Sequence, residues 1–240
     1  MRRSALIIAF VAMTSLGCGL EPDRVFERNA PEVDEALEAL DAGEAGAAAR
    51  LLEGYLGTGK CEGGELGVSD FARSRKNASF DLGLTLFFFA EQFGPRFGDE
   101  PTQVDGGPTE EQKRLMGLRG EQVTCALRLL RAIGASKDVP IDLAARAKYL
   151  EGNLEFLRSN YRDAVKAYDE SLGLIPGIAG DAGDSIGRDA AWNRAIALKR
   201  IEEENDRDAG EDGAQDSSPD TDSGSPDGGQ DAPQETGDEG

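Results

Sequence analysis

The residues best spaced for chemistry lie between Gly54 and Lys60, which have the glycine and lysine spacing of a phosphate-binding loop. In such a loop a Ser or Thr follows the lysine and binds magnesium, but here Cys61 follows it. The segment also ends a predicted helix, whereas a phosphate-binding loop follows a strand and opens a helix. We therefore interpret it as an ordinary helix end and expect no nucleotide or other cofactor.

Acidic pairs are the second group of residues that could act on a substrate. Glu110 with Glu111, and the acidic run 202–204, could supply the two carboxylates of glycoside hydrolysis, but solvated charge is the ordinary explanation at helix ends. The chain contains no histidine, which removes the commonest general base and the commonest zinc ligand. We expect neither an enzyme nor a metal site, and we keep a carboxylate-dependent envelope hydrolase as an alternative.

The first 17 residues have the pattern of a secretory signal peptide. Arg2 and Arg3 precede an apolar run, and small residues lead to Cys18. The segment Ser15 to Cys18 resembles the lipobox of bacterial lipoproteins, in which the cysteine is acylated and becomes the mature N-terminus. That resemblance implies a lipid anchor at Cys18 in the bacterial cell envelope. It also implies the outer membrane, facing the periplasm, because Gly19 and not aspartate follows the cysteine.

Export would place the two remaining cysteines, Cys61 and Cys125, in an oxidising compartment. Two alternatives are open for them. A disulfide between them would stabilise the fold by about 4 kcal/mol in the chain-entropy model. Alternatively, both are buried free thiols that act as small apolar residues. Their spacing alone does not decide between the two.

The body of the chain is rich in Ala, Leu, Arg and Glu and lacks the alternating pattern of strands, which favours an all-helical fold. Glycines and prolines divide it, and Ser69 and the Thr109–Gln112 capping box mark helix starts. We expect the apolar run Leu82 to Phe89 to be a central core helix. The predicted helical segments are 33–40 (ended by Gly43), 45–56, 69–93, 109–134 and one that begins near Pro140.

The spacing is most specific over residues 143–176, where the sequence resembles the tetratricopeptide repeat (TPR). Gly152 and Ala164 match the small residues at which the two helices of a repeat approach each other. The aromatic, apolar and terminating proline positions are matched by Tyr161, Tyr168, Leu172 and Pro176. The sequence departs from the pattern at Glu155, Ser159 and Ser171, where Tyr, Gly and Ala are usual. By analogy, the candidate partner-binding residues of a concave groove are Tyr149, Asn153, Arg158, Arg188 and Asn193.

Residues 188–206 are expected to form an amphipathic capping helix, whose predicted apolar side is Trp192, Ala195, Ile196 and Leu198. An acidic tail follows over residues 207–240, with eleven acidic and no basic residues after Arg207, and we expect it to be disordered. A repeat, a short helix and a low-complexity tail together resemble the TPR component of bacterial aerotolerance (Bat) operons. That resemblance implies partners with von Willebrand factor A domains.

The sequence thus predicts an all-α protein built as a TPR-like solenoid of helical hairpins. Its parts are a signal peptide (1–17), a linker (18–30), the helical domain (31–206) and the tail (207–240). The net charge of −20, or −22 without Arg2 and Arg3, would repel nucleic acid. The expected function is a membrane-anchored adaptor that binds envelope proteins, and the alternative is a structural or secretion-machinery lipoprotein without a discrete ligand.

Overall fold

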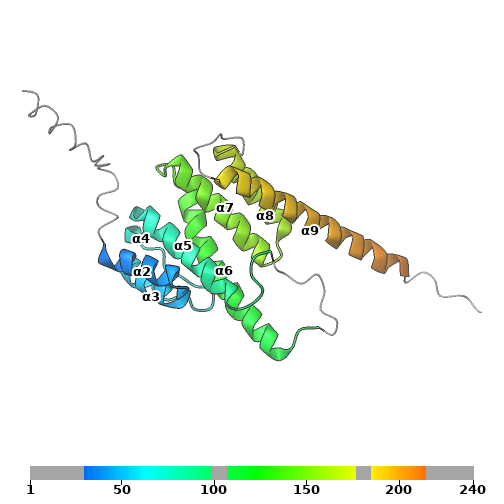
Figure 1. Cartoon of the computed structure of the whole chain (residues 1–240), viewed down its shortest axis with the longest axis horizontal. Helices are drawn as coiled ribbons and strands as arrows, with labels where there is room; N and C mark the ends of the chain where they lie inside the picture. Colours follow the sequence, from blue (N-terminus) through cyan, green and yellow to red (C-terminus); the bar gives the residue numbers. More distant parts are fainter. Residues whose placement is uncertain (1–29, 99–106, 177–184, 215–240) are drawn as a thin grey trace, which may run out of the picture. The chain divides into compact units, whose positions relative to one another are not determined.

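The computed structural model describes residues 30–98, 107–176 and 185–214, and every regular element within these ranges is a helix. The predicted all-α class is therefore confirmed. A single isolated bridge between Glu62 and Glu65 is the only β-type pairing of the described residues. The helices, labelled in Figure 1, are α2 (Pro31–Asp41), α3 (Ala45–Leu56), α4 (Asp70–Ser74), α5 (Lys76–Glu91), α6 (Glu110–Gly134), α7 (Ile141–Leu157), α8 (Tyr161–Leu174) and α9 (Ile186–Ala214).

The helices pack mainly against their neighbours in sequence. Three hairpins, α2/α3, α5/α6 and α7/α8, are joined by contacts of α3 with α5 and of α6 with α7 (Figure 1). The contacts divide the chain into two units, Met1–Ile201 and Glu202–Gly240, and each is treated by itself. Within the first unit, α9 bonds to the last hairpin through Asn193 and Arg194.

Helix ends follow the local signals in the sequence. Gly43 (φ 80°) turns the chain between α2 and α3, and the Ser69 hydroxyl accepts the Ala72 N–H at 3.0 Å to begin α4. Thr109 and Gln112 form the predicted capping box of α6. The predicted helix 69–93 is instead two helices, because Arg75 leaves helical geometry between them.

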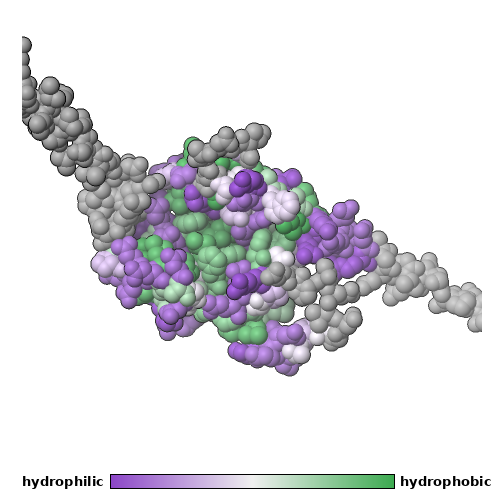
Figure 2. Space-filling model, in the orientation of Figure 1, coloured by the Kyte–Doolittle hydropathy of each residue, from purple (hydrophilic) through white to green (hydrophobic). Residues whose placement is uncertain are grey.

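The main core is built around α5, which contacts both α3 and α6. Leu82, Leu86 and Phe87 of the predicted core helix are buried, whereas Phe88 is 41% exposed. Four consecutive aromatic and apolar residues cannot share one helix face, and the outward one is Phe88. Apolar residues accordingly gather in the middle of the face in Figure 2, over α5 and α7, while the surface of α2 is largely hydrophilic.

A disulfide joins Cys61, in the loop after α3, to Cys125 in the middle of α6, with an S–S distance of 2.05 Å and a Cα–Cα distance of 6.0 Å. Of the two alternatives that the spacing left open, the structure has the covalent one. Both cysteines belong to the main buried cluster, so the bond fixes the loop against the core.

Two expectations for the last helix are wrong. The buried side of α9 is made by Ile186, Ala190, Asn193 and Ala197, which recur every three or four residues. Trp192, expected on the apolar inner side, is 70% exposed, and Leu198 is 42% exposed. The pattern was ambiguous because apolar residues lie on two opposite sides of this helix, and small alanines line the inner one.

The boundary between helix and tail is also corrected. The helix begins at Ile186 and ends at Ala214, so residues 207–214 are helical and not part of a disordered tail. Because Pro219 is the first proline after Ile186, nothing in the sequence forces the helix to stop at residue 206, and each added residue gains one backbone hydrogen bond. The predicted signal peptide, the lipidation site Cys18 and the rest of the tail lie outside the described residues. Among the described helices, none is long and apolar enough to cross a membrane.

Candidate functional site

Helix α7 is the element around which the candidate site is built. Residues 151–157 are all buried, although they include Glu151, Asn153 and Glu155. Polar groups are buried only when they have partners, so each of these side chains requires one on a neighbouring helix or turn. The partners come from α6, α8, α9 and the turn after α7.

The contact between α7 and α8 depends on Gly152. A Cβ added at this glycine would lie 2.4 Å from Cε1 of Tyr168, well inside van der Waals contact. Tyr168 and Ala164 are fully buried, and Tyr161 contacts Phe156 with ring centroids 5.0 Å apart. Leu172 packs at the edge of the same cluster, and Pro176 follows α8 on the exposed side. The residues that carry the repeat pattern therefore meet in one hairpin.

The three departures from the repeat pattern have physical explanations. Ser159 adopts a positive φ of 63°, the left-handed conformation for which glycine is usual. Ser171 is fully buried, and its hydroxyl donates to the Ala145 carbonyl oxygen at 2.9 Å. Glu155 is only 1% exposed and is the centre of a network of ion pairs.

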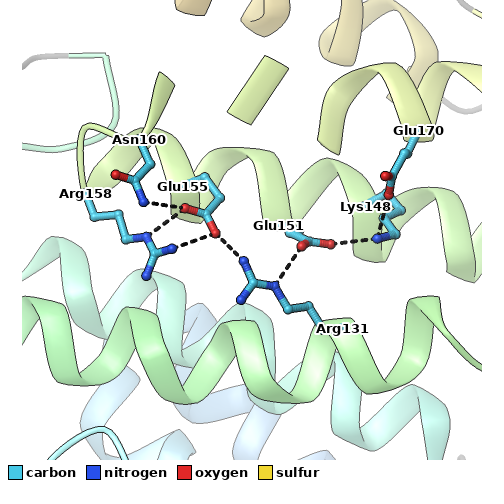
Figure 3. A network of polar contacts seen from close by, with 7 residues as sticks. All are labelled: Arg131, Lys148, Glu151, Glu155, Arg158, Asn160 and Glu170. Carbon is cyan, nitrogen blue, oxygen red and sulfur yellow. Dashed lines mark hydrogen bonds and ion pairs between the residues drawn. The ribbon is translucent and has the colours of Figure 1, made fainter. Parts of the chain in front are cut away.

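The charge network connects α6 to the α7/α8 hairpin (Figure 3). Lys148, Glu151 and Glu155 lie three and four residues apart, on the side of α7 that faces Arg131 of α6. Arg131 donates through Nε to Glu151 Oε1 at 2.9 Å and through Nη2 to Glu155 Oε1. Lys148 Nζ donates to Glu151 Oε2 at 2.9 Å and to Glu170 Oε2 of α8 at 2.7 Å. The network therefore bridges three helices.

Glu155 receives further donors from the turn after α7. Arg158 donates to both its carboxylate oxygens, at 2.7 and 2.9 Å, and Asn160 Nδ2 donates to Oε2 at 3.1 Å. With Arg131, three residues therefore satisfy one carboxylate that is closed off from water. Bidentate guanidinium contacts of this kind are the strong form of an ion pair, and they fix the orientation of the acid.

Two cations of the network, Lys148 and Arg131, have raised pKa values. Burial alone would lower the pKa of Lys148, but its hydrogen bonds to Glu170 and Glu151 and their charges raise it above the ordinary value. Burial likewise works against the charged form of Arg131, and the hydrogen bond to Glu151 with the charges of Glu151 and Glu155 raises its pKa overall. The network thus pairs each of these cations with carboxylates of neighbouring helices.

A second polar cluster lies on another side of α7. Asn153 Oδ1 accepts from the Tyr168 hydroxyl at 2.8 Å and from Asn193 Nδ2 of α9 at 3.0 Å, and Asn193 also donates to the Tyr149 hydroxyl oxygen at 3.1 Å. Three of the five candidate partner-binding residues, Tyr149, Asn153 and Asn193, are therefore brought together, but they bond to one another. Asn153 and Asn193 are buried.

The other two candidates lie apart from this cluster. Arg158 belongs to the charge network around Glu155. Arg188 is on the surface, with its side chain 78% exposed and a loose 3.8 Å ion pair to Asp189. The five residues do not line one groove together.

The remaining acid of chemical interest is Glu53, near the disulfide. Burial raises the pKa of its carboxyl, and only part of this shift is offset by the Cys61 N–H, which it accepts at 2.9 Å. Its carboxylate thus holds the loop 57–69, which contains the second half of the phosphate-loop-like segment. Gly57 ends α3 there with a φ of 63°, as expected for an ordinary helix end. Within the described ranges, no group of His, Cys, Asp or Glu could hold a metal ion.

A shallow groove of about 300 Å³ lies between α4, α5 and the end of α6. Its walls are mainly apolar, and Lys76 at its edge is bonded to Asp138 Oδ2 at 2.6 Å and to the Asp138 carbonyl oxygen. The interaction holds the pKa of Asp138 down at about 2. None of the predicted binding residues lines this groove.

Sequence reasoning missed Arg131, Lys148, Glu151 and Glu170. A signal was present in α7, because the charged residues 148, 151 and 155 recur at one-face spacing. The partner Arg131 could not be found in this way, since its pairing depends on how α6 packs. Comparison with known proteins identifies no relative: no family model, no curated protein and no solved structure matches the chain.

Proposed function

We propose that this chain is a scaffold of TPR-like helical hairpins that binds other proteins and performs no catalysis. The observation that carries the proposal is the contact of Gly152 with Tyr168 within a hairpin that packs on the preceding one. Such hairpins cannot bury their apolar faces alone, and stacks of them serve as extended binding surfaces. The buried acids Glu151 and Glu155 are paired with cations, which supports a structural role for them.

The scaffold would be attached to the bacterial envelope through a lipid on Cys18. The lipobox-like segment Ser15 to Cys18 supports this anchor, and the disulfide between Cys61 and Cys125 is the kind of bond that persists in an oxidising compartment such as the periplasm. By the resemblance to lipoprotein sorting signals, the outer membrane facing the periplasm is the proposed location.

The charge of the chain restricts its partners. A net charge of −20 repels nucleic acid and favours proteins with cationic surfaces. The resemblance to the TPR component of Bat operons supports von Willebrand factor A-domain proteins as one class of envelope partner. Arg188 is the candidate binding residue that remains exposed for such a contact.

Crosslinking followed by affinity capture from the native envelope tests the proposal. The full-length protein is compared with a deletion of residues 141–204, whose remaining helix content is checked by circular dichroism, and with Cys18→Ser, which removes only the anchor. We expect a discrete envelope protein to be captured by the full chain and lost with the deletion. If nothing is captured above the control, the scaffold proposal fails, and a structural spacer or secretion-machinery lipoprotein without a ligand takes its place.

A further inference from the structure

Helix α9 has apolar residues on two opposite sides, and the described residues cover only one of them. Ala190 and Ala197 belong to the buried cluster of the α7/α8 hairpin, and Ile186 is buried on the same side of α9. On the other side Ala191, Trp192, Ala195 and Leu198 are exposed, and Trp192 is the only tryptophan of the chain. We call these four residues the outer stripe. A helix that is apolar on both sides is normally buried on both, so the outer stripe marks an interaction surface.

The chain beyond α9 does not provide a cover for the outer stripe. Residues 202–240 contain no Val, Leu, Ile, Met, Phe, Trp or Tyr, so they could not form an apolar face against it. The tail is therefore not a suitable occupant, and the character of the occupant can be inferred from the arrangement of the stripe itself.

Apart from Ala191, the outer stripe is symmetric about Ala195. Trp192 stands three residues before it and Leu198 three residues after it, and all three project within one third of the helix circumference. In an antiparallel pair of α9 helices centred on Ala195, each Trp192 would therefore lie level with Leu198 of the other copy. The small central alanine allows the two backbones to approach closely, and large side chains fill the space on either side.

Charge is arranged in the same symmetric way. Arg188 stands seven residues before Ala195 and Glu202 seven residues after it, on nearly the same face of the helix. An antiparallel pair would bring each arginine beside the glutamate of the other copy. A parallel pair would instead align the acidic stretches 202–212 of both copies, which repel each other. The same helix is thus complementary to itself in one orientation only.

We propose that the outer stripe is the contact surface of a two-fold dimer, in which α9 pairs antiparallel with α9 of a second copy of this chain. This goes beyond the proposed function, because it needs no envelope partner. Its success or failure is therefore separate from the outcome of affinity capture: purified protein alone decides it.

The first test uses the full chain with Cys18→Ser, which removes the proposed lipid anchor. Analytical ultracentrifugation measures its molecular mass as a function of protein concentration. We expect a shift from monomer to dimer, with a parallel blue shift of the single tryptophan's emission as Trp192 becomes covered. Trp192→Ala should weaken dimerisation about tenfold or more, as for an interface anchor. Met116→Ala is the matched control, since Met116 is 62% exposed on α6, away from the stripe, and should change nothing.

The second test determines the orientation. Ala195→Cys places a thiol on the two-fold axis and should give a disulfide-linked dimer under mild oxidation, whereas Met116→Cys should not. Arg188→Glu should weaken the dimer, and adding Glu202→Arg should restore it, because the ion pair is then reversed. A protein that stays monomeric at the highest soluble concentration, a dimer unaffected by Trp192→Ala, or an Ala195→Cys variant that does not crosslink would each overturn the proposal.

Discussion

The two junctions between hairpins are held in different ways. At the first, between α2/α3 and α5/α6, the disulfide Cys61–Cys125 fixes the connecting loop to α6, and the ion pair Glu65–Arg128 beside it is exposed. At the second, between α6 and α7/α8, the bonds are electrostatic and centre on the buried Glu155. Arg128 and Arg131 lie one turn apart on α6, so one helix serves both junctions.

The difference teaches which conditions each junction resists. A disulfide acts on the unfolded chain and is insensitive to salt, whereas a charge network acts in the folded state and requires both partners to remain. Reductant should therefore weaken the first junction and leave the second unchanged. Removal of one charge at Arg131 should do the reverse.

The largest effect is expected from loss of the disulfide. Replacing Cys61 and Cys125 by serine should lower the free energy of unfolding by about 4 kcal/mol, because the cross-link closes a loop with a sequence separation of 64 residues. Urea denaturation of the variant, compared with wild type in the presence and absence of reductant, measures the change. A loss below about 1 kcal/mol would mean that the first junction is held by apolar packing alone.

The next largest effect concerns the hairpin that carries the second junction. Gly152→Ala should lower the free energy of unfolding by about 3 kcal/mol, because the new methyl group overlaps the Tyr168 ring and neither helix can move freely. Gly173→Ala in α8 is the matched control: its Cβ would meet nothing within 4 Å, so it should stabilise by about 0.5–1 kcal/mol through helix propensity. Thermal unfolding followed by circular dichroism distinguishes the two. If both variants unfolded at the same temperature, the close contact between Gly152 and Tyr168 would be contradicted.

The charge network itself is tested by Arg131→Met. In this variant Glu151 would still be paired with Lys148, and Glu155 with Arg158 and Asn160. We therefore expect the free energy of unfolding to fall by about 2 kcal/mol, less than if a buried acid lost all its partners. Arg128→Met, one turn away in an exposed pair, should lower the free energy of unfolding less than Arg131→Met does. Chemical denaturation measures the free energy of unfolding of both variants. If Arg128→Met lowered it more than Arg131→Met, the proposed difference between the two junctions would be contradicted.

The smallest effect is expected at Glu53. Burial raises the pKa of this carboxyl in the folded state, so its ionised form destabilises the fold. This loss of stability begins as the pH rises above the ordinary pKa of 4.5 and is absent below it. Glu53→Gln keeps an acceptor for the Cys61 N–H and should stabilise by up to about 1 kcal/mol at pH 7 and not at all at pH 4. Stability measured at both pH values checks the sign; a variant less stable at pH 7 contradicts it.

The sequence predicted what is decided locally. The limits of α3, the turn at Gly43 and the capping box at Thr109 follow from neighbouring residues, and Gly152 predicted the close approach of two helices. The pairing of Arg131 with Glu155, 24 residues apart, could not be predicted, because it depends on how α6 packs against α7. The inner side of α9 was predicted wrongly because large apolar residues outweigh small ones in a periodic pattern, although here the small ones are buried.

The disulfide also has a consequence for proteolysis. A protease that cuts any one peptide bond between Cys61 and Cys125, for example in the exposed stretch from Gly107 to Glu110, leaves both fragments covalently attached. The nicked molecule would migrate as an intact chain until reductant is added, and then as two pieces. With the proposed lipid anchor at Cys18, such a ring would keep the α6–α9 portion tethered to the cell after the backbone has been broken.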